Sequence, residues 1–267
     1  MPRPSLLRLA ALITGGAAVV ALAVAPSTLG AARSGERVEL ASYPTNAGKI
    51  YRWGNAQWSD DFIGPVKQMW AQIKPGLIDD QHGMLTLNGT GHSGTVAATL
   101  TGHGRTVGRW EARVRAEQYS RGHTPFKVVW ELIPTGAYHC GARSIVLASY
   151  PLGGSRAHMA VHNGRSQFTA AKKRDLSAGP FHTYAVEVTK SHVSWFVDTH
   201  VIRTERRPQA LSGAELKVRF RLVAQGGHRM DPGRMQMDWV RYYSLQRKNA
   251  RSIDAPAMQR SSYAAAC

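Results

Sequence analysis

Hydrophobic residues between positions 84 and 243 recur in short segments that Gly, Pro and Ser separate. Trp110–Ala116 and Lys217–Leu222 alternate apolar and charged residues with the period of two that half-buried strands show. No stretch of ten or more residues has a convincing helical period. The segments predicted as strands are Met84–Leu87, Trp110–Ala116, Lys127–Ile133, Ser144–Tyr150, Ala157–His162, Thr183–Thr189, Val193–Val197, Leu216–Val223 and Met235–Tyr243. This pattern favours an all-β, antiparallel two-sheet sandwich or jelly roll.

The N-terminal segment has the layout of a secretory signal peptide. Arg3 and Arg8 precede an apolar stretch, Leu9–Ala25, and small residues follow as far as Ala32. We therefore expect residues 1–32 to be removed and the protein to be secreted, although the cleavage site is left open. An uncleaved membrane anchor is the alternative, because about 20 apolar residues span a bilayer. No later segment is apolar enough to cross a membrane.

The remaining chain predicts one domain. We expect a linker at residues 33–49, a folded domain at 50–246 and a mobile polar tail at 247–267. The net charge is +17, and residues 1–32 contribute only two Arg to it. Such an excess favours an anionic partner, for example an acidic glycan or the cell-envelope polymer, through attraction that salt weakens. A basic surface that only confers solubility is the alternative.

Other partners and cofactors have little support. The basic residues are scattered through the strands and no helix-turn-helix or zinc pattern occurs, so nucleic acid is not expected. Cys140 and Cys267 allow at most one disulfide within the chain, and the sequence leaves open whether they pair. The 11 His residues form no ligand-spaced cluster, so neither a metal nor another cofactor is predicted. The oligomeric state is not predicted.

The order of several short motifs is more specific than any one of them. They are Asp60-Asp61-Phe62 with Trp70, His82–Leu87, Gly108–Arg113, Phe181–Val188, Ser194–Asp198, Val223–Gly227 and Met235–Tyr243. Together they resemble glycoside hydrolase family 16, which includes the laminarinases and lichenases, over residues 50–246. The resemblance implies a jelly roll of the concanavalin A type whose concave face carries a glycan cleft.

The same resemblance exposes a missing set of acids. Family members carry a strand Glu-x-Asp-x-Glu or Glu-x-Asp-x-x-Glu, whose first Glu is the nucleophile and whose last Glu is the acid/base. The corresponding strand is Gly141–Tyr150. Aligned on Gly141, the three positions are Ala142, Ser144 and Val146 or Leu147; aligned on Tyr150, they are Ser144, Val146 and Ser149. Neither alignment supplies an acid, so double-displacement hydrolysis at this strand is not expected.

Glu131 is the candidate catalytic residue that remains. It lies in Val128–Pro134, which resembles a cleft strand of the family, at the position of a cleft Trp. The alternative is a Glu that pairs with a nearby Arg. Sugar binding uses aromatic faces and a few polar groups. The residues expected to contact a glycan are Trp130, Ser144, Ser149, Tyr150, His162 and Trp195.

The other acids have structural explanations. Glu111, Glu187, Asp238 and Asp60-Asp61 are expected to hold the framework, and Asp198 is expected in a hairpin turn. Two stacking surfaces of the family are also missing: its Gly-Gly-Asn-Trp is Gly226–Arg229 in this chain, and its Trp-Pro is Thr124-Pro125.

The sequence therefore predicts a secreted, family-16-like jelly roll that binds polysaccharide or cell-envelope polymer with impaired hydrolysis. One alternative is an active endo-β-glycanase that uses a non-standard acid such as Glu131. A secreted domain with a purely structural role is the other alternative.

Overall fold

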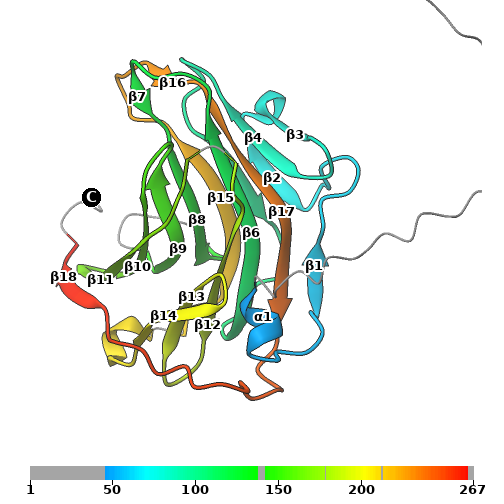
Figure 1. The fold of residues 1–267 in the computed structure, drawn as a ribbon. Coiled ribbons are helices and arrows are strands. Elements are labelled where there is room, and N and C mark those ends of the chain that lie inside the picture. The colour runs from blue at the N-terminus through cyan, green and yellow to red at the C-terminus, as the bar shows by residue number, and fades with distance from the viewer. Residues whose placement is uncertain (1–45, 138–141, 178, 212, 264–267) are drawn as a thin grey trace, which may run out of the picture. The chain divides into compact units, whose positions relative to one another are not determined.

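The strands alternate between buried and outward-facing side chains, and two antiparallel sheets result (Figure 1). The computed structural model describes residues 46–137, 142–177, 179–211 and 213–263. Sheet A has the order β14 (His200–Glu205), β13 (Val193–Val197), β12 (His182–Val188), β6 (Gly108–Gln118), β17 (Gly233–Tyr243), β4 (Leu85–Gly89) and β3 (Ile78–Asp80), with β1 (Trp58–Asp60) beside β17. Sheet B has the order β18 (Gln259–Ser262), β11 (Ser166–Lys173), β10 (Arg156–Asn163), β9 (Ser144–Pro151), β8 (Lys127–Pro134), β15 (Leu216–Val223), β5 (Val96–Leu100) and β2 (Trp70–Ile73).

The remaining elements are short. Strands β7 (Thr124–Pro125) and β16 (Met230–Asp231) pair in parallel, and the helical turns are α1 (Ala47–Ile50), η1 (Pro75–Leu77) and η2 (Pro208–Ala210). No helix in the described ranges is long and apolar enough to cross a membrane. The predicted all-β, antiparallel two-sheet architecture is confirmed.

The main core lies between the two sheets. In β15 the alternation buries Val218 and Phe220 and places Arg219 and Arg221 on the opposite side of the strand. The Phe220 ring lies 5.8 Å from the Trp130 ring of the neighbouring strand β8, measured between centroids. Burial of one such large apolar side chain stabilises the fold by about 1.5–3 kcal/mol. This core fixes which face of sheet B points outward.

A second, smaller core covers part of the outer face of sheet A. Tyr51 and Trp53, which follow α1, pack against Phe196 of β13 and Tyr243 of β17, mostly edge to face. Asn46 caps α1 by accepting a hydrogen bond from the Lys49 N–H. The folded domain therefore begins at least four residues before the expected start at residue 50.

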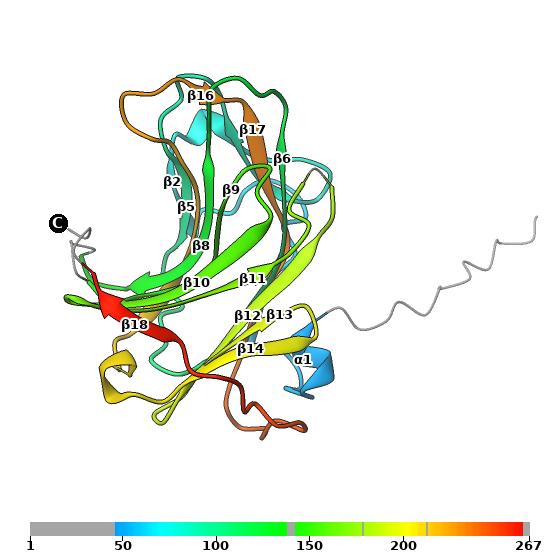
Figure 2. The same cartoon turned by 60° about the vertical axis from the view of Figure 1, so that its left-hand side comes forward.

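The C-terminal segment differs from the expected mobile tail. Gln259–Ser262 forms β18, which pairs antiparallel with β11 at the edge of sheet B, as Figure 2 shows. Met258 enters the main core, and its backbone carbonyl accepts a hydrogen bond from Arg207. The described part of the tail is thus an integral edge of the sheet. The predicted signal peptide, Cys140 and Cys267 lie outside the described residues.

Candidate functional site

The register of β9 decides which of its side chains leave the core. Ser144, Val146 and Ser149 are paired with His162, Ala160 and His158 of β10, and a bulge falls between the last two pairs. A bulge adds one residue to one strand and shifts the alternation beyond it. Ser144, Val146 and Ser149 therefore share the outward-facing side of sheet B, as the alignment on Tyr150 requires.

This side of sheet B is hollowed by a cavity of about 210 Å³. Its lining comes from β8, β9, β10, β11 and β15, together with one residue that follows β18. The lining residues are Lys127, Val129, Glu131, Val146, Ser149, His158, Met159, Ala160, His162, Thr169, Arg221 and Tyr263. Within the described ranges Glu131 is the one acidic residue among them. The cavity thus lacks the pair of carboxyl groups that glycoside hydrolysis ordinarily uses.

Glu131 lies in the cavity wall but is engaged by two guanidinium groups. Arg219 Nε donates a hydrogen bond of 2.8 Å to Glu131 Oε1, and Arg221 Nε lies 2.7 Å from the same oxygen as an ion-pair partner. The Glu131 side chain is only 3% exposed. Glu131 therefore faces the cavity and at the same time forms the pairing with Arg that was the alternative expectation. A general acid must present its proton to the substrate, and Oε1 already accepts from a cation.

Ser144 and His162 form a polar contact beside Glu131. Ser144 Oγ lies 3.2 Å from His162 Nδ1, and the His162 ring stacks on Tyr263 with 4.0 Å between centroids and 8° between planes. Burial lowers the pKa of His162, the charge of Glu131 acts in the opposite direction, and Lys127 lowers it further. Ser144 has a base beside it, but its side chain is fully buried and cannot attack a sugar. The contact orients His162 instead.

Three aromatic residues expected to contact a glycan lie in the core instead. Trp130, Tyr150 and Trp195 are between 0% and 2% exposed and belong to the main hydrophobic cluster. Trp195 donates its indole N–H to the Val146 carbonyl at 3.1 Å, and so contacts β9 from the side of the core. Their expected stacking role is wrong, because neighbouring residues of a strand point to opposite faces. Trp130 therefore points away from Glu131, and Tyr150 away from Ser149.

Several residues of the cavity were not expected from the sequence. Arg221 could have been found, because the alternation in Lys217–Leu222 already separates it from the core face. Lys127 of β8 and His158 of β10 had no such signal, because these strands do not alternate regularly between buried and exposed residues. No sequence pattern could have indicated Tyr263. It follows a polar strand, β18, that is positioned by backbone pairing with β11.

The acids of sheet A serve the framework, as expected. Glu111 Oε1 accepts the Ala47 N–H at 2.6 Å, and burial raises the pKa of Glu111 to about 7. Glu187 binds Arg109 and accepts from His192 at 2.9 Å if the imidazole carries the proton there. Asp238 pairs with Arg113 at 2.6 Å. None of the three lines the cavity of sheet B.

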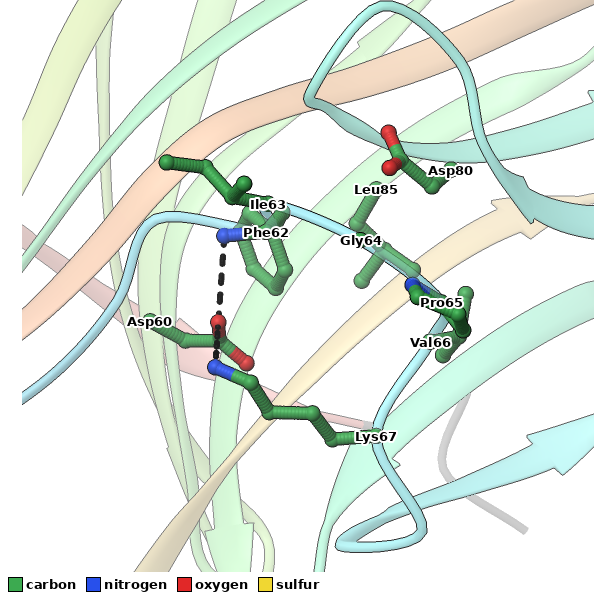
Figure 3. Close-up of a pocket in the computed structure, with 9 residues that line it drawn as sticks. All are labelled: Asp60, Phe62, Ile63, Gly64, Pro65, Val66, Lys67, Asp80 and Leu85. Atoms are coloured by element: carbon green, nitrogen blue, oxygen red, sulfur yellow. Dashed lines mark hydrogen bonds and ion pairs between the residues drawn. The ribbon is translucent and has the colours of Figure 1, made fainter.

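Asp60 and Asp198 are held in the same way. Figure 3 shows Asp60 beside a small hollow near the start of the domain, where it accepts from the Phe62 N–H at 3.0 Å and from Lys67 Nζ at 2.6 Å. The hollow holds only about 10 Å³, which is too little for a sugar. Asp198 takes a left-handed conformation, with φ of 56°, between β13 and β14, which confirms the expected hairpin turn. No group of three potential metal ligands occurs in the parts of the chain that the structure describes.

Comparison with known proteins supports the resemblance seen in the sequence. Residues 155–241 match the glycosyl hydrolases family 16 sequence family. The matched segment begins just after β9, so it does not include the strand on which the family's acids would lie. A search of the curated proteins finds no significant match.

Solved structures show the same fold at low sequence identity. The laminarinase from Rhodothermus marinus is 17% identical, with a TM-score of 0.59 over 71% of this chain and 97% of that chain. The endo-1,3-β-glucanase (laminarinase) catalytic domain from Thermotoga petrophila is 14% identical, with a TM-score of 0.57 over 72% and 98%. An endo-β-galactosidase from Clostridium perfringens that releases GlcNAcα1-4Gal is 12% identical, with a TM-score of 0.58 over 71% and 62%.

The described chain thus has the jelly-roll fold of these glycoside hydrolases. The resemblance to glycoside hydrolase family 16 seen in the sequence is confirmed by the family match over residues 155–241 and by the shared fold.

Proposed function

We propose that this domain binds a polysaccharide on the outer face of sheet B without cleaving it. The family match and the glucanase and galactosidase structures that share the fold support a glycan as the ligand. The observation that carries the proposal is the outward-facing set of β9, which consists of Ser144, Val146 and Ser149 in place of three acids.

The chemistry of the cavity supports binding over hydrolysis. A retaining glycosidase needs two carboxyl groups about 5–5.5 Å apart, and an inverting one needs two at about 6.5–9.5 Å. Among the described residues the cavity offers Glu131 alone, and Arg219 and Arg221 both engage its Oε1. The polar groups that remain, such as Ser149 and His162, can exchange hydrogen bonds with sugar hydroxyls.

We propose in addition that the protein is exported and binds its polymer outside the cell. The basic and apolar layout of residues 1–32 supports export, and the net charge of +17 supports attraction to an acidic glycan or to an anionic cell-envelope polymer. An exported binding domain would meet such polymers outside the cell.

A panel of polymers tests the proposal. Affinity electrophoresis of the purified protein would use laminarin, lichenan, galactan and acidic polysaccharides in the gel. Ser149→Trp fills the cavity and should abolish retardation by the polymer that binds. Ser191→Trp is the matched control, because Ser191 is exposed beyond β12 on the other sheet and should bind as the wild type does.

Two results would overturn the proposal. One is that no polymer of the panel retards the wild-type protein. The other is that Ser149→Trp, with an unchanged melting temperature, binds as tightly as the control variant.

A further inference from the structure

We infer that the cavity on sheet B contains a subsite for an anionic substituent of the glycan, such as a carboxylate or a sulfate ester, held by Arg221 and Lys127. The inference rests on the proposed function, which names a polysaccharide as the ligand. It adds the chemical class of that polysaccharide and the residues that select it.

The balance of charge in the cavity is the first argument. Arg221 and Lys127 both line it, and Arg219 contacts the same acid as Arg221. Lys127 is exposed and forms no ion pair with an acid of the described ranges. The described lining of the cavity therefore carries the positive charges of Arg221 and Lys127 against the single negative charge of Glu131.

The geometry of Arg221 is the second argument. Its Nε lies 2.7 Å from Glu131 Oε1, yet this buried atom makes no hydrogen bond of acceptable geometry in the described structure. The side chain as a whole is 26% exposed and lines the cavity. A guanidinium carries five N–H donors in a planar fork that matches carboxylate, sulfate and phosphate oxygens. Arg221 therefore has donors to offer to a ligand in addition to its ion pair.

The apolar floor is the third argument, because it distinguishes a sugar site from a merely basic surface. Val129, Val146 and Ala160 form a small hydrophobic cluster on the outward-facing side of sheet B. The stacked rings of His162 and Tyr263 form a wall at one end of the same cavity. A sugar ring has an apolar face that packs on such a floor. The anionic substituent would then point toward Lys127 and Arg221.

Screening gives the subsite a measurable signature. Exposed charges lose their attraction beyond about 8 Å at physiological ionic strength, and added salt shortens this distance further. Binding of a charged polymer to this cavity should therefore weaken with salt, whereas packing on the apolar floor should change little.

Matched polymers and matched variants test the subsite. Isothermal titration calorimetry would compare laminarin and galactan with the carboxymethylated and sulfated derivatives of the same chains. Arg221→Gln and Lys127→Gln each remove one charge from the cavity. Arg203→Gln on β14 and Lys190→Gln beyond β12 remove the same charges from sheet A and leave the net charge equal. Lys127→Gln alters an exposed side chain, so it keeps the test valid if Arg221→Gln folds poorly.

The expected result is a charged derivative that binds at least about tenfold more tightly than its neutral parent, with the advantage lost in Arg221→Gln and Lys127→Gln and kept in both controls. A preference for sulfate over carboxylate, or the reverse, would identify the substituent. Equal affinity for neutral and charged polymers would overturn the subsite and leave the proposed function standing. Equal losses in the sheet A controls would also overturn it, because the effect would then come from net charge. No binding to any polymer would overturn both proposals.

Discussion

Glu111 and Glu187 of sheet A differ in the origin of their partners from Glu131, the one acid among the described residues that line the cavity of sheet B. Glu111 and Glu187 lie on the outer side of sheet A, where the Ala47 N–H of α1 and the Asn249 side chain supply part of their hydrogen bonds. Glu131 lies on the outer side of sheet B, where a cavity stays open and both of its partners come from the adjacent strand β15. Glu111 and Glu187 thus also bind segments outside the sheet, whereas both cationic partners of Glu131 lie on one neighbouring strand.

The residues that stabilise the fold are therefore different from the residues that face the cavity of sheet B. Glu111 connects residue 47 to β6, and Glu187 connects β12 to Arg109 and Asn249. These links do not depend on the outward-facing residues of β9, which are Ser144, Val146 and Ser149. A family-16-like jelly roll can therefore keep its framework while its open face carries a different set of groups.

Removal of one Arg partner from Glu187 and from Glu131 is expected to give the largest difference in stability between the two sheets. Arg109→Met leaves Glu187 buried with only His192 and Asn249, and loss of one partner of a buried ion pair costs about 3–5 kcal/mol. Arg219→Met leaves Glu131, which is as buried as Glu187, with the second guanidinium group of Arg221, so the expected loss is about 1 kcal/mol. Urea unfolding measures both values. Equal losses would contradict the distinction between the two sheets.

The pH dependence of stability gives a smaller effect on sheet A. Burial raises the pKa of Glu111 from 4.5 to about 7. The folded protein then holds a proton that the unfolded chain releases, so stability is fully present below about pH 4.5 and is lost as the pH rises to about 7. A shift of this size corresponds to about 3 kcal/mol.

Glu111→Gln removes this titration and tests it directly. The free energy of unfolding of the wild type, minus that of Glu111→Gln, should fall as the pH is raised from 5 to 8. Other titrating groups, such as His182 with its raised pKa, are present in both proteins and cancel in the difference. A difference that stays constant over this range would show that Glu111 does not titrate there.

Much of the fold could be predicted from the sequence, because period-two alternation defines strands and their faces. The alternation in Lys217–Leu222 matches the buried and outward-facing sides of β15. Alignment on Tyr150 also gave the correct outward-facing set of β9, although only the register with β10 could show that a bulge makes Ser144 and Ser149 share one face.

The candidate site was only partly predictable. The resemblance to family motifs led to the prediction that Trp130 and Glu131 both lie in the cleft. This prediction ignored the alternation, because neighbouring residues of a strand cannot share a face. Tyr263 was missed for a different reason. Its strand, Gln259–Ser262, is polar and short, and it exists through backbone pairing with the edge of sheet B, which no local pattern reveals.

An assay for reducing ends released from a bound polymer tests directly whether the domain binds a polysaccharide without cleaving it. The wild-type protein should retain the polymer and release no reducing ends above a protein-free control, because the described lining of the cavity offers one acidic group, which two Arg side chains engage. Steady release by the wild type, lost by about 100-fold or more in a folded Glu131→Gln variant, would contradict the claim. Glu131 would then be the acid or base of an active endo-β-glycanase.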